Sequence, residues 1–85
     1  MSNFVNCMMI PEKTDMVNHP PHYKSANGIE CIDAIEAAVE GLDAFAGYCV
    51  GNAMKYIWRH NKKGKPVEDI SKAIWYLNKL AEKYK

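Results

Sequence analysis

The chain has 85 residues, 48% of them hydrophobic, and a formal net charge of +1. This length predicts one small domain whose core alone is marginally stabilising, so we expect a ligand or oligomerisation to add stability. The near-neutral charge argues against a general nucleic-acid binder. No apolar run is long enough to span a membrane, and the three cysteines form no CxxC motif. We therefore expect a cytoplasmic protein without membrane contacts.

The N-terminal part lacks the periodicity of a helix or strand. We interpret residues 1–16 as a poorly ordered leader and residues 17–85 as a single helical domain. The motif His19-Pro20-Pro21-His22-Tyr23 predicts an extended segment, because consecutive prolines restrict the backbone. Prolines between the two histidines also prevent helical metal-ligand spacing, so we assign no metal site there. Such a strap could cap the core or present His22 and Tyr23 to a ligand.

Three helices follow, which predicts an all-α fold: a compact three-helix domain. The first is expected from about Ile29 to Glu40, ending before Gly41. The second should begin after Asp43, a good N-cap, and run to about Asn61. The third should start at Pro66, which suits the first position of a helix. Its predicted buried face comprises Ile70, Ala73, Ile74, Leu77, Leu80, Ala81 and Tyr84.

The second helix carries a polar stripe on an otherwise apolar surface. At about 100° per residue, Tyr48, Asn52, Lys55, Arg59 and Lys62 share one narrow face. Lysine and arginine head groups at this spacing can converge on one anion, and the planar arginine fork suits phosphate oxygens. The alternative is a solvated helix face that pairs with the acids of the first helix. Both interpretations remain open at this point.

Other patterns are less specific. Glu30, Asp33 and Glu36 form an acidic row that either faces solvent or helps to hold Mg²⁺ beside substrate phosphates. Gly47 and Gly51 permit close approach of another backbone or a ligand. Trp75 points away from the predicted buried face, which suggests a subunit interface. The chain contains no GxxxxGK[ST] motif, so any phosphate chemistry must use side chains on helices.

Several segments together resemble a known family. They are Asn18-His-Pro-Pro-His-Tyr23, Ile29-Glu-Cys-Ile-Asp-Ala-Ile-Glu36, Gly47-Tyr-Cys-Val-Gly-Asn-Ala-Met-Lys-Tyr56, Arg59 with Lys62-Lys63, Glu68-Asp-Ile-Ser-Lys-Ala73, and Trp75-Tyr-Leu77. The family consists of small phage proteins of unknown function labelled "nucleotide kinase". It is similar to the C-terminal part of the early nucleotide kinase of a T-odd coliphage. The resemblance covers roughly Val17 to Leu80.

The resemblance implies a phage or prophage protein, located in the host cytoplasm, that forms a homo-oligomer and handles nucleotides. The coliphage kinase transfers a phosphoryl group from a nucleoside triphosphate to dTMP or dGMP without a P-loop. Two features depart from it. The long cysteine-bearing N-terminal region of the kinase has no counterpart, which leaves catalysis open. His60-Asn61 replaces a small residue and glycine before the paired lysines.

Residues and resemblance together predict a phage nucleotide-binding protein that resembles a nucleoside monophosphate kinase. The candidate catalytic residues are Lys55, Arg59 and His22. The candidate ligand-binding residues are Tyr23, Tyr48, Asn52, Lys62 and Lys63. No cofactor is assigned, but a nucleoside triphosphate is the candidate phosphoryl donor and Mg²⁺ its candidate companion. The alternative is a non-catalytic protein that sequesters a host nucleotide signal.

Overall fold

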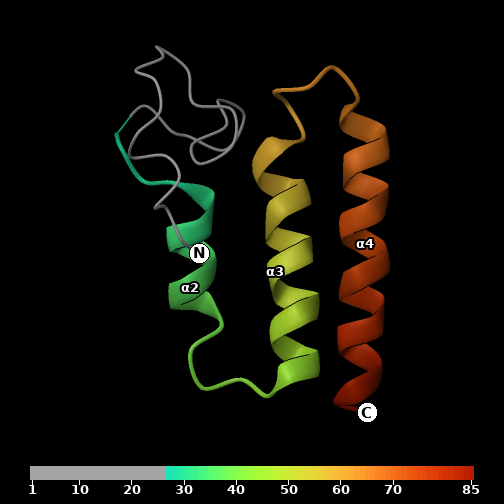
Figure 1. The fold of residues 1–85 in the computed structure, drawn as a ribbon. Coiled ribbons are helices and arrows are strands. Elements are labelled where there is room, and N and C mark those ends of the chain that lie inside the picture. Colours follow the sequence, from blue (N-terminus) through green and yellow to red (C-terminus); the bar gives the residue numbers. More distant parts are fainter. Residues whose placement is uncertain (1–26) are drawn as a thin grey trace, which may run out of the picture.

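The structure is a computed structural model that describes residues 27–85, and these residues form three helices and no strand (Figure 1). Helix α2 spans Cys31–Ala38, α3 spans Ala44–Arg59 and α4 spans Pro66–Lys83. The predicted all-α, three-helix fold is confirmed for this part of the chain. The predicted leader and the extended segment with His22 and Tyr23 lie outside the described residues. None of the three helices is long and apolar enough to cross a membrane.

The ends of the helices follow from local sequence. The Asp43 carboxylate accepts a hydrogen bond of 2.8 Å from the backbone N–H of Ala46, so the predicted N-cap of α3 is confirmed. Pro66 occupies the first turn of α4, also as predicted. Helix α2 is shorter than the expected 29–40, because the chain already leaves the helix at Val39 and turns through Gly41 at a φ of +82°. Glycine tolerates that backbone conformation without strain.

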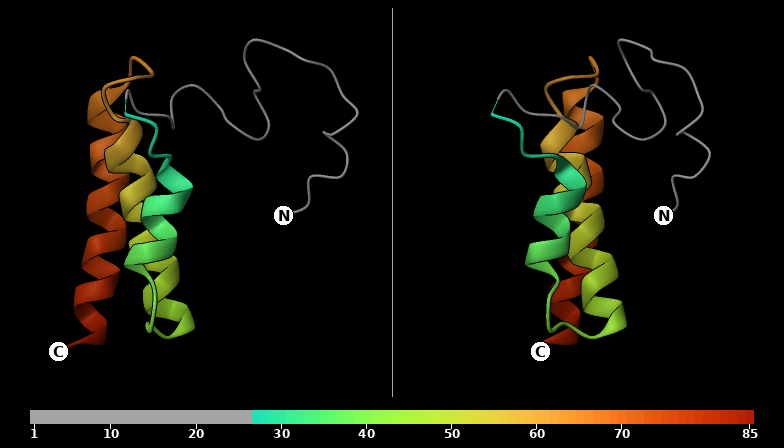
Figure 2. Two further views of the ribbon diagram at one scale, coloured as in Figure 1. Left: turned by 90° about the vertical axis from the view of Figure 1, so that its left-hand side faces the viewer. Right: turned by 60° about the vertical axis from the view of Figure 1, so that its left-hand side comes forward.

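The helices stand side by side, with α3 between α2 and α4 (Figure 1), and the views in Figure 2 show their axes roughly parallel. The α3–α4 contact is the more extensive one. Glycines bring α2 close to α3: a methyl group added at Gly51 would lie 3.4 Å from Ile35, and one at Gly47 would lie 3.8 Å from Val39. The close approach expected at these glycines is therefore made by side chains of α2 and of Val39, the residue at its C-cap.

This arrangement buries few residues, most of them small. The fully buried set among residues 27–85 is Cys31, Ala46, Cys49, Ala53, Ala73 and one charged residue, Asp69. The predicted buried face of the third helix is partly wrong, because Ile70, Ile74 and Leu77 are exposed, Ile74 by 50%. Ala73 is buried as predicted, and α4 also turns Asp69, which was not part of that predicted face, toward α3. A helix at the edge of a single layer contacts a neighbour on one side only, so much of its apolar surface stays open.

Candidate functional site

The predicted polar stripe lies on one side of the helical layer. Gly51 of α3 faces α2, and Tyr56 of α3 stacks on Tyr76 of α4. The stripe residues Tyr48, Asn52, Lys55 and Arg59 fall between these two directions on the α3 surface. The structure therefore brings these four side chains together on α3, between its two neighbours.

Arg59 is held in an ion pair rather than presented to solvent. Its guanidinium donates to the Asp69 carboxylate at 3.3 Å, and the two side chains are only 13% and 3% exposed. The second carboxylate oxygen of Asp69 is buried and has no hydrogen-bond partner among the described residues. Asp69 also lies in the first turn of α4, where an acid is favourable. Its additional role is to fix the arginine at the junction of α3 and α4.

Three further predicted binding residues are Asn52, within the stripe on α3, and Lys62 and Lys63, which follow the C-terminal end of α3. The Lys62 ammonium donates to the carbonyl oxygen of Trp58 at 2.9 Å, so it caps the C-terminus of α3. The Asn52 amide donates to the carbonyl oxygen of Tyr48, also at 2.9 Å. Lys63 is exposed in the turn before α4. These positions are compatible with ligand contact, and their roles stay predictions.

Positive charge gathers around the ring of Tyr56. The Lys55 ammonium lies 4.8 Å from the ring centroid, the Arg59 guanidinium 4.9 Å and the Lys72 ammonium 5.4 Å. We call these three side chains the cation cluster. Lys72 comes from α4, so the cluster depends on the packing of two helices and is more than a repeat along one of them. Cations over an aromatic face gain electrostatic stabilisation from the ring. Arg59 and Lys72 are also paired with carboxylates, those of Asp69 and Glu68, each at 3.3 Å, which offsets part of the repulsion among the three charges.

The electrostatic influence of the stripe extends to α2. Burial raises the pKa of the Cys31 thiol, and the positive charges of Lys55 and Lys62 partly oppose that shift. Cys31 is the first residue of α2. The basic stripe thus acts on the N-terminal end of α2 as well as on the α3–α4 junction. An anion bound near Lys55 would lie in this positive field.

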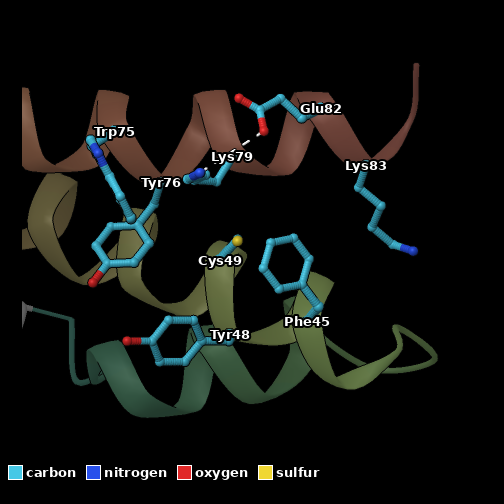
Figure 3. Close-up of a pocket in the computed structure, with 8 residues that line it drawn as sticks. All are labelled: Phe45, Tyr48, Cys49, Trp75, Tyr76, Lys79, Glu82 and Lys83. Atoms are coloured by element: carbon cyan, nitrogen blue, oxygen red, sulfur yellow. Dashed lines mark ion pairs between the residues drawn. The ribbon is translucent and has the colours of Figure 1, made fainter.

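Figure 3 shows an aromatic groove between α3 and α4, and its Tyr76 side chain contacts Tyr56, the ring of the cation cluster. Tyr76 stacks on Tyr56 with centroids 6.1 Å apart, and its edge contacts reach Tyr48 at 5.7 Å and Trp75 at 5.0 Å. A hydrogen bond with Tyr48 is the largest of the effects that raise the pKa of Tyr76 to about 12. The groove has a volume of about 340 Å³, and its lining includes Phe45, Tyr48, Cys49, Trp75, Tyr76 and Lys79.

Part of this site was missed by sequence reasoning. Lys72 and Lys79 were not singled out, and Trp75 was interpreted as a subunit contact rather than as the wall of a groove. A signal for them exists in the sequence: Lys72, Lys79 and Lys83 recur at i, i+7 and i+11, which places them on one side of α4. The packing of α4 on α3 then decides that this side adjoins the stripe.

The site offers no preformed metal cage. Within residues 27–85, no group of three or more His, Cys, Asp or Glu side chains is arranged to hold a metal ion. The acidic row on α2 therefore does not form such a cluster. Mg²⁺ commonly binds through one or two carboxylates together with substrate phosphates. A metal that arrives with a nucleotide remains compatible with these residues.

Comparison of the sequence with known protein families assigns the chain to one of them. A model described as a protein of unknown function, DUF3310, matches residues 17–78. The chain belongs to the DUF3310 family. This confirms the resemblance that the motifs indicated. No solved structure matches this DUF3310 chain significantly.

Two phage proteins are similar to this DUF3310 chain. One is the gene 1.7 protein of Enterobacteria phage T3, 38% identical over 63 residues, which cover 71% of this chain. The other is the nucleotide kinase gp1.7 of Escherichia phage T7, 36% identical over 77 residues, which cover 87% of this chain. The match spans 38% of the length of each relative.

Proposed function

We propose that this chain is a phage protein that binds nucleotides on the side of the layer that carries the cation cluster, and that it acts as a nucleoside monophosphate kinase. The observation that carries the proposal is the gathering of Lys55, Arg59 and Lys72 around one tyrosine ring. Cationic side chains from two helices converge there, and phosphate oxygens would accept hydrogen bonds from them beside the carboxylates of Asp69 and Glu68, with which Arg59 and Lys72 are paired at 3.3 Å. A similar phage protein is named a nucleotide kinase, which supports the same assignment.

The proposed reaction moves the terminal phosphoryl group of a nucleoside triphosphate to a phosphate oxygen of a nucleoside monophosphate. The bond between the β-phosphate's bridging oxygen and the γ-phosphorus breaks, a bond forms between that phosphorus and an oxygen of the monophosphate, and the products are two nucleoside diphosphates. Such a transfer depends mainly on positioning and charge stabilisation. Lys55 and Lys72 would hold phosphate oxygens. Arg59, fixed by Asp69, would offer its guanidinium in a set orientation to the transferring group.

The remaining predicted residues have supporting roles in this proposal. Tyr48 and Asn52 would contact base or sugar, and Lys62 and Lys63 would extend the positive surface. His22 and Tyr23 would orient the acceptor from the segment outside the described residues. Mg²⁺ would arrive with the triphosphate and neutralise part of its charge. The site of action would be the cytoplasm of the infected host.

A second candidate is a non-catalytic protein that sequesters a nucleotide. One observation favours it: the strongest phosphate-binding side chain, Arg59, is already paired with the buried Asp69 carboxylate. Part of its charge is thereby offset before any ligand arrives, which suits binding better than charge stabilisation during transfer. The two candidates share the same face of the molecule and differ in what happens to the ligand.

The deciding experiment incubates the purified protein with ATP, Mg²⁺ and each deoxynucleoside monophosphate, and measures product masses. A diphosphate made from the monophosphate supports the kinase. Tight binding with every nucleotide returned intact supports sequestration. Lys55→Ala should weaken nucleotide binding by roughly tenfold, because it removes a charged hydrogen-bond donor. Lys85→Ala, which removes an exposed lysine at the chain end, should leave binding unchanged.

We also propose that the protein is a homo-oligomer. Ile70, Ile74 and Leu77 recur at i, i+4 and i+7 on α4, and all three are exposed. They lie on a different side of α4 from the groove residues Trp75 and Lys79. A chain with so small a buried core gains stability when a second copy covers such a surface. Nucleotide binding and self-association would then use opposite sides of the layer.

A further inference from the structure

The aromatic groove has the walls of a stacking site. Phe45 and Tyr48 come from α3, Trp75 and Tyr76 from α4, and the buried Cys49 lies between them (Figure 3). Trp75 is 56% exposed, although it is the largest side chain on α4. A cluster of exposed aromatic rings in so small a protein marks a contact surface rather than part of a core.

The groove has the size and chemistry for a flat ring. Its volume of about 340 Å³ is within the range of small-molecule sites. Aromatic walls bind a planar heterocycle through its faces, as in proteins that stack nucleobases on tyrosine and tryptophan. The Lys79 ammonium lies at the rim, 5.5 Å from the Trp75 ring and 4.0 Å from the Glu82 carboxylate. Both members of that ion pair are exposed, so the pair is weak and Lys79 can turn toward an anion.

The groove and the cation cluster form one continuous surface through Tyr76. This ring stacks on Tyr56, around which the cations gather, and also touches Tyr48 and Trp75 of the groove. A ligand that uses both parts must combine a flat apolar ring with negative charge a short distance away. A nucleotide has this combination. A fatty acid or an apolar peptide lacks either the planar ring or the cluster of phosphate charges.

We infer that the aromatic groove binds the base of the nucleotide whose phosphates the cation cluster holds; this inference rests on the proposed function. Trp75 and Tyr48 supply the stacking surfaces. The base therefore lies toward the C-terminal end of α4, and the phosphates lie toward its N-terminal end. The orientation of the ligand along the two helices is thereby fixed.

The test is isothermal titration of wild-type protein, Trp75→Ala and Trp75→Phe with ATP and dTTP, and with inorganic tripolyphosphate as a ligand without a base. Trp75→Ala should weaken nucleotide binding on the order of tenfold, the usual loss when a stacking ring is removed. It should leave tripolyphosphate binding unchanged, and Trp75→Phe should retain most of the nucleotide affinity. Tyr84→Ala, which removes an exposed ring outside the groove at the C-cap of the same helix, is the matched control.

The remaining outcomes separate this inference from the proposed function. If Trp75→Ala and Tyr48→Ala both bind nucleotides like the wild type while Lys55→Ala does not, the groove is not the base site and the phosphate site stands. If wild-type protein binds nucleotides but not tripolyphosphate, and Trp75→Ala loses the nucleotide, the groove stands and the cation cluster fails. Binding of a short oligothymidylate without binding of any mononucleotide would assign the groove to single-stranded nucleic acid and overturn the inference.

Discussion

At the scale of single residues, the Arg59–Asp69 pair is the contact with the largest expected effect on stability. Asp69→Ala would leave the guanidinium in a nearly closed environment without its partner carboxylate. Breaking a buried ion pair from one side typically destabilises by about 3–5 kcal/mol, and we expect a value near the lower end because Arg59 retains some exposure. Urea unfolding measures this loss in the free energy of unfolding.

The control is Glu68→Ala, which removes an exposed acid one position away and should lower the free energy of unfolding by less than about 1 kcal/mol. Equal costs for the two variants would contradict the structural role of Asp69.

Tyr76 gives the protein a specific dependence on alkaline pH. An unfolded tyrosine loses its proton near pH 10, whereas Tyr76 in the folded protein has a pKa of about 12. Between these values the folded state binds more protons than the unfolded state, so stability should fall as the pH rises. Unfolding free energies of wild type and Tyr76→Phe are measured from about pH 9 to pH 11.5, and above pH 10 the wild-type value should fall more steeply with pH than that of Tyr76→Phe. Parallel curves would show that the phenol is not shifted.

At the scale of helices, the two glycines of α3 set how closely α2 packs. A methyl group fits at Gly47, 3.8 Å from Val39, and Gly47→Ala should stabilise the protein by about 0.5–1 kcal/mol through helix propensity. Gly51→Ala should gain less, since its methyl group would lie 3.4 Å from Ile35. Thermal unfolding of the two variants measures the difference. A larger gain at Gly51 than at Gly47 would mean that α2 packs less closely than described.

The helices could be predicted from the sequence better than the faces they bury. Asp43 and Pro66 are local signals, and both mark a helix start where expected. Burial depends on neighbours, so the periodicity of α4 could not reveal that Asp69 faces α3 while Ile74 is exposed. The composition of the candidate site likewise depends on how neighbouring helices pack. Lys55 and Arg59 were identified from their spacing along one helix, but Lys72 joins them only through the packing of two helices.

At the scale of the whole molecule, the exposed side of α4 predicts an assembly. Ile74→Glu combined with Leu77→Glu would place two charges on the proposed contact surface, and the species in solution should fall to the single-chain mass of 9.7 kDa. Sedimentation equilibrium measures it. Lys79→Glu introduces the same charge on the groove side of the same helix and should leave the assembly intact. A monomeric wild type, or an assembly that survives the double substitution, would refute the self-association proposal.

The position of α3 between its two neighbours also determines the order in which the structure can open. Helix α2 has eight residues and packs on α3, whereas the eighteen residues of α4 form a longer seam with α3. Short, lightly packed elements detach at a lower free energy than long ones. Release of α2 leaves the α3–α4 hairpin in place, with the cation cluster and the aromatic groove still assembled. The proposed ligand face therefore belongs to the part of the described fold that opens last.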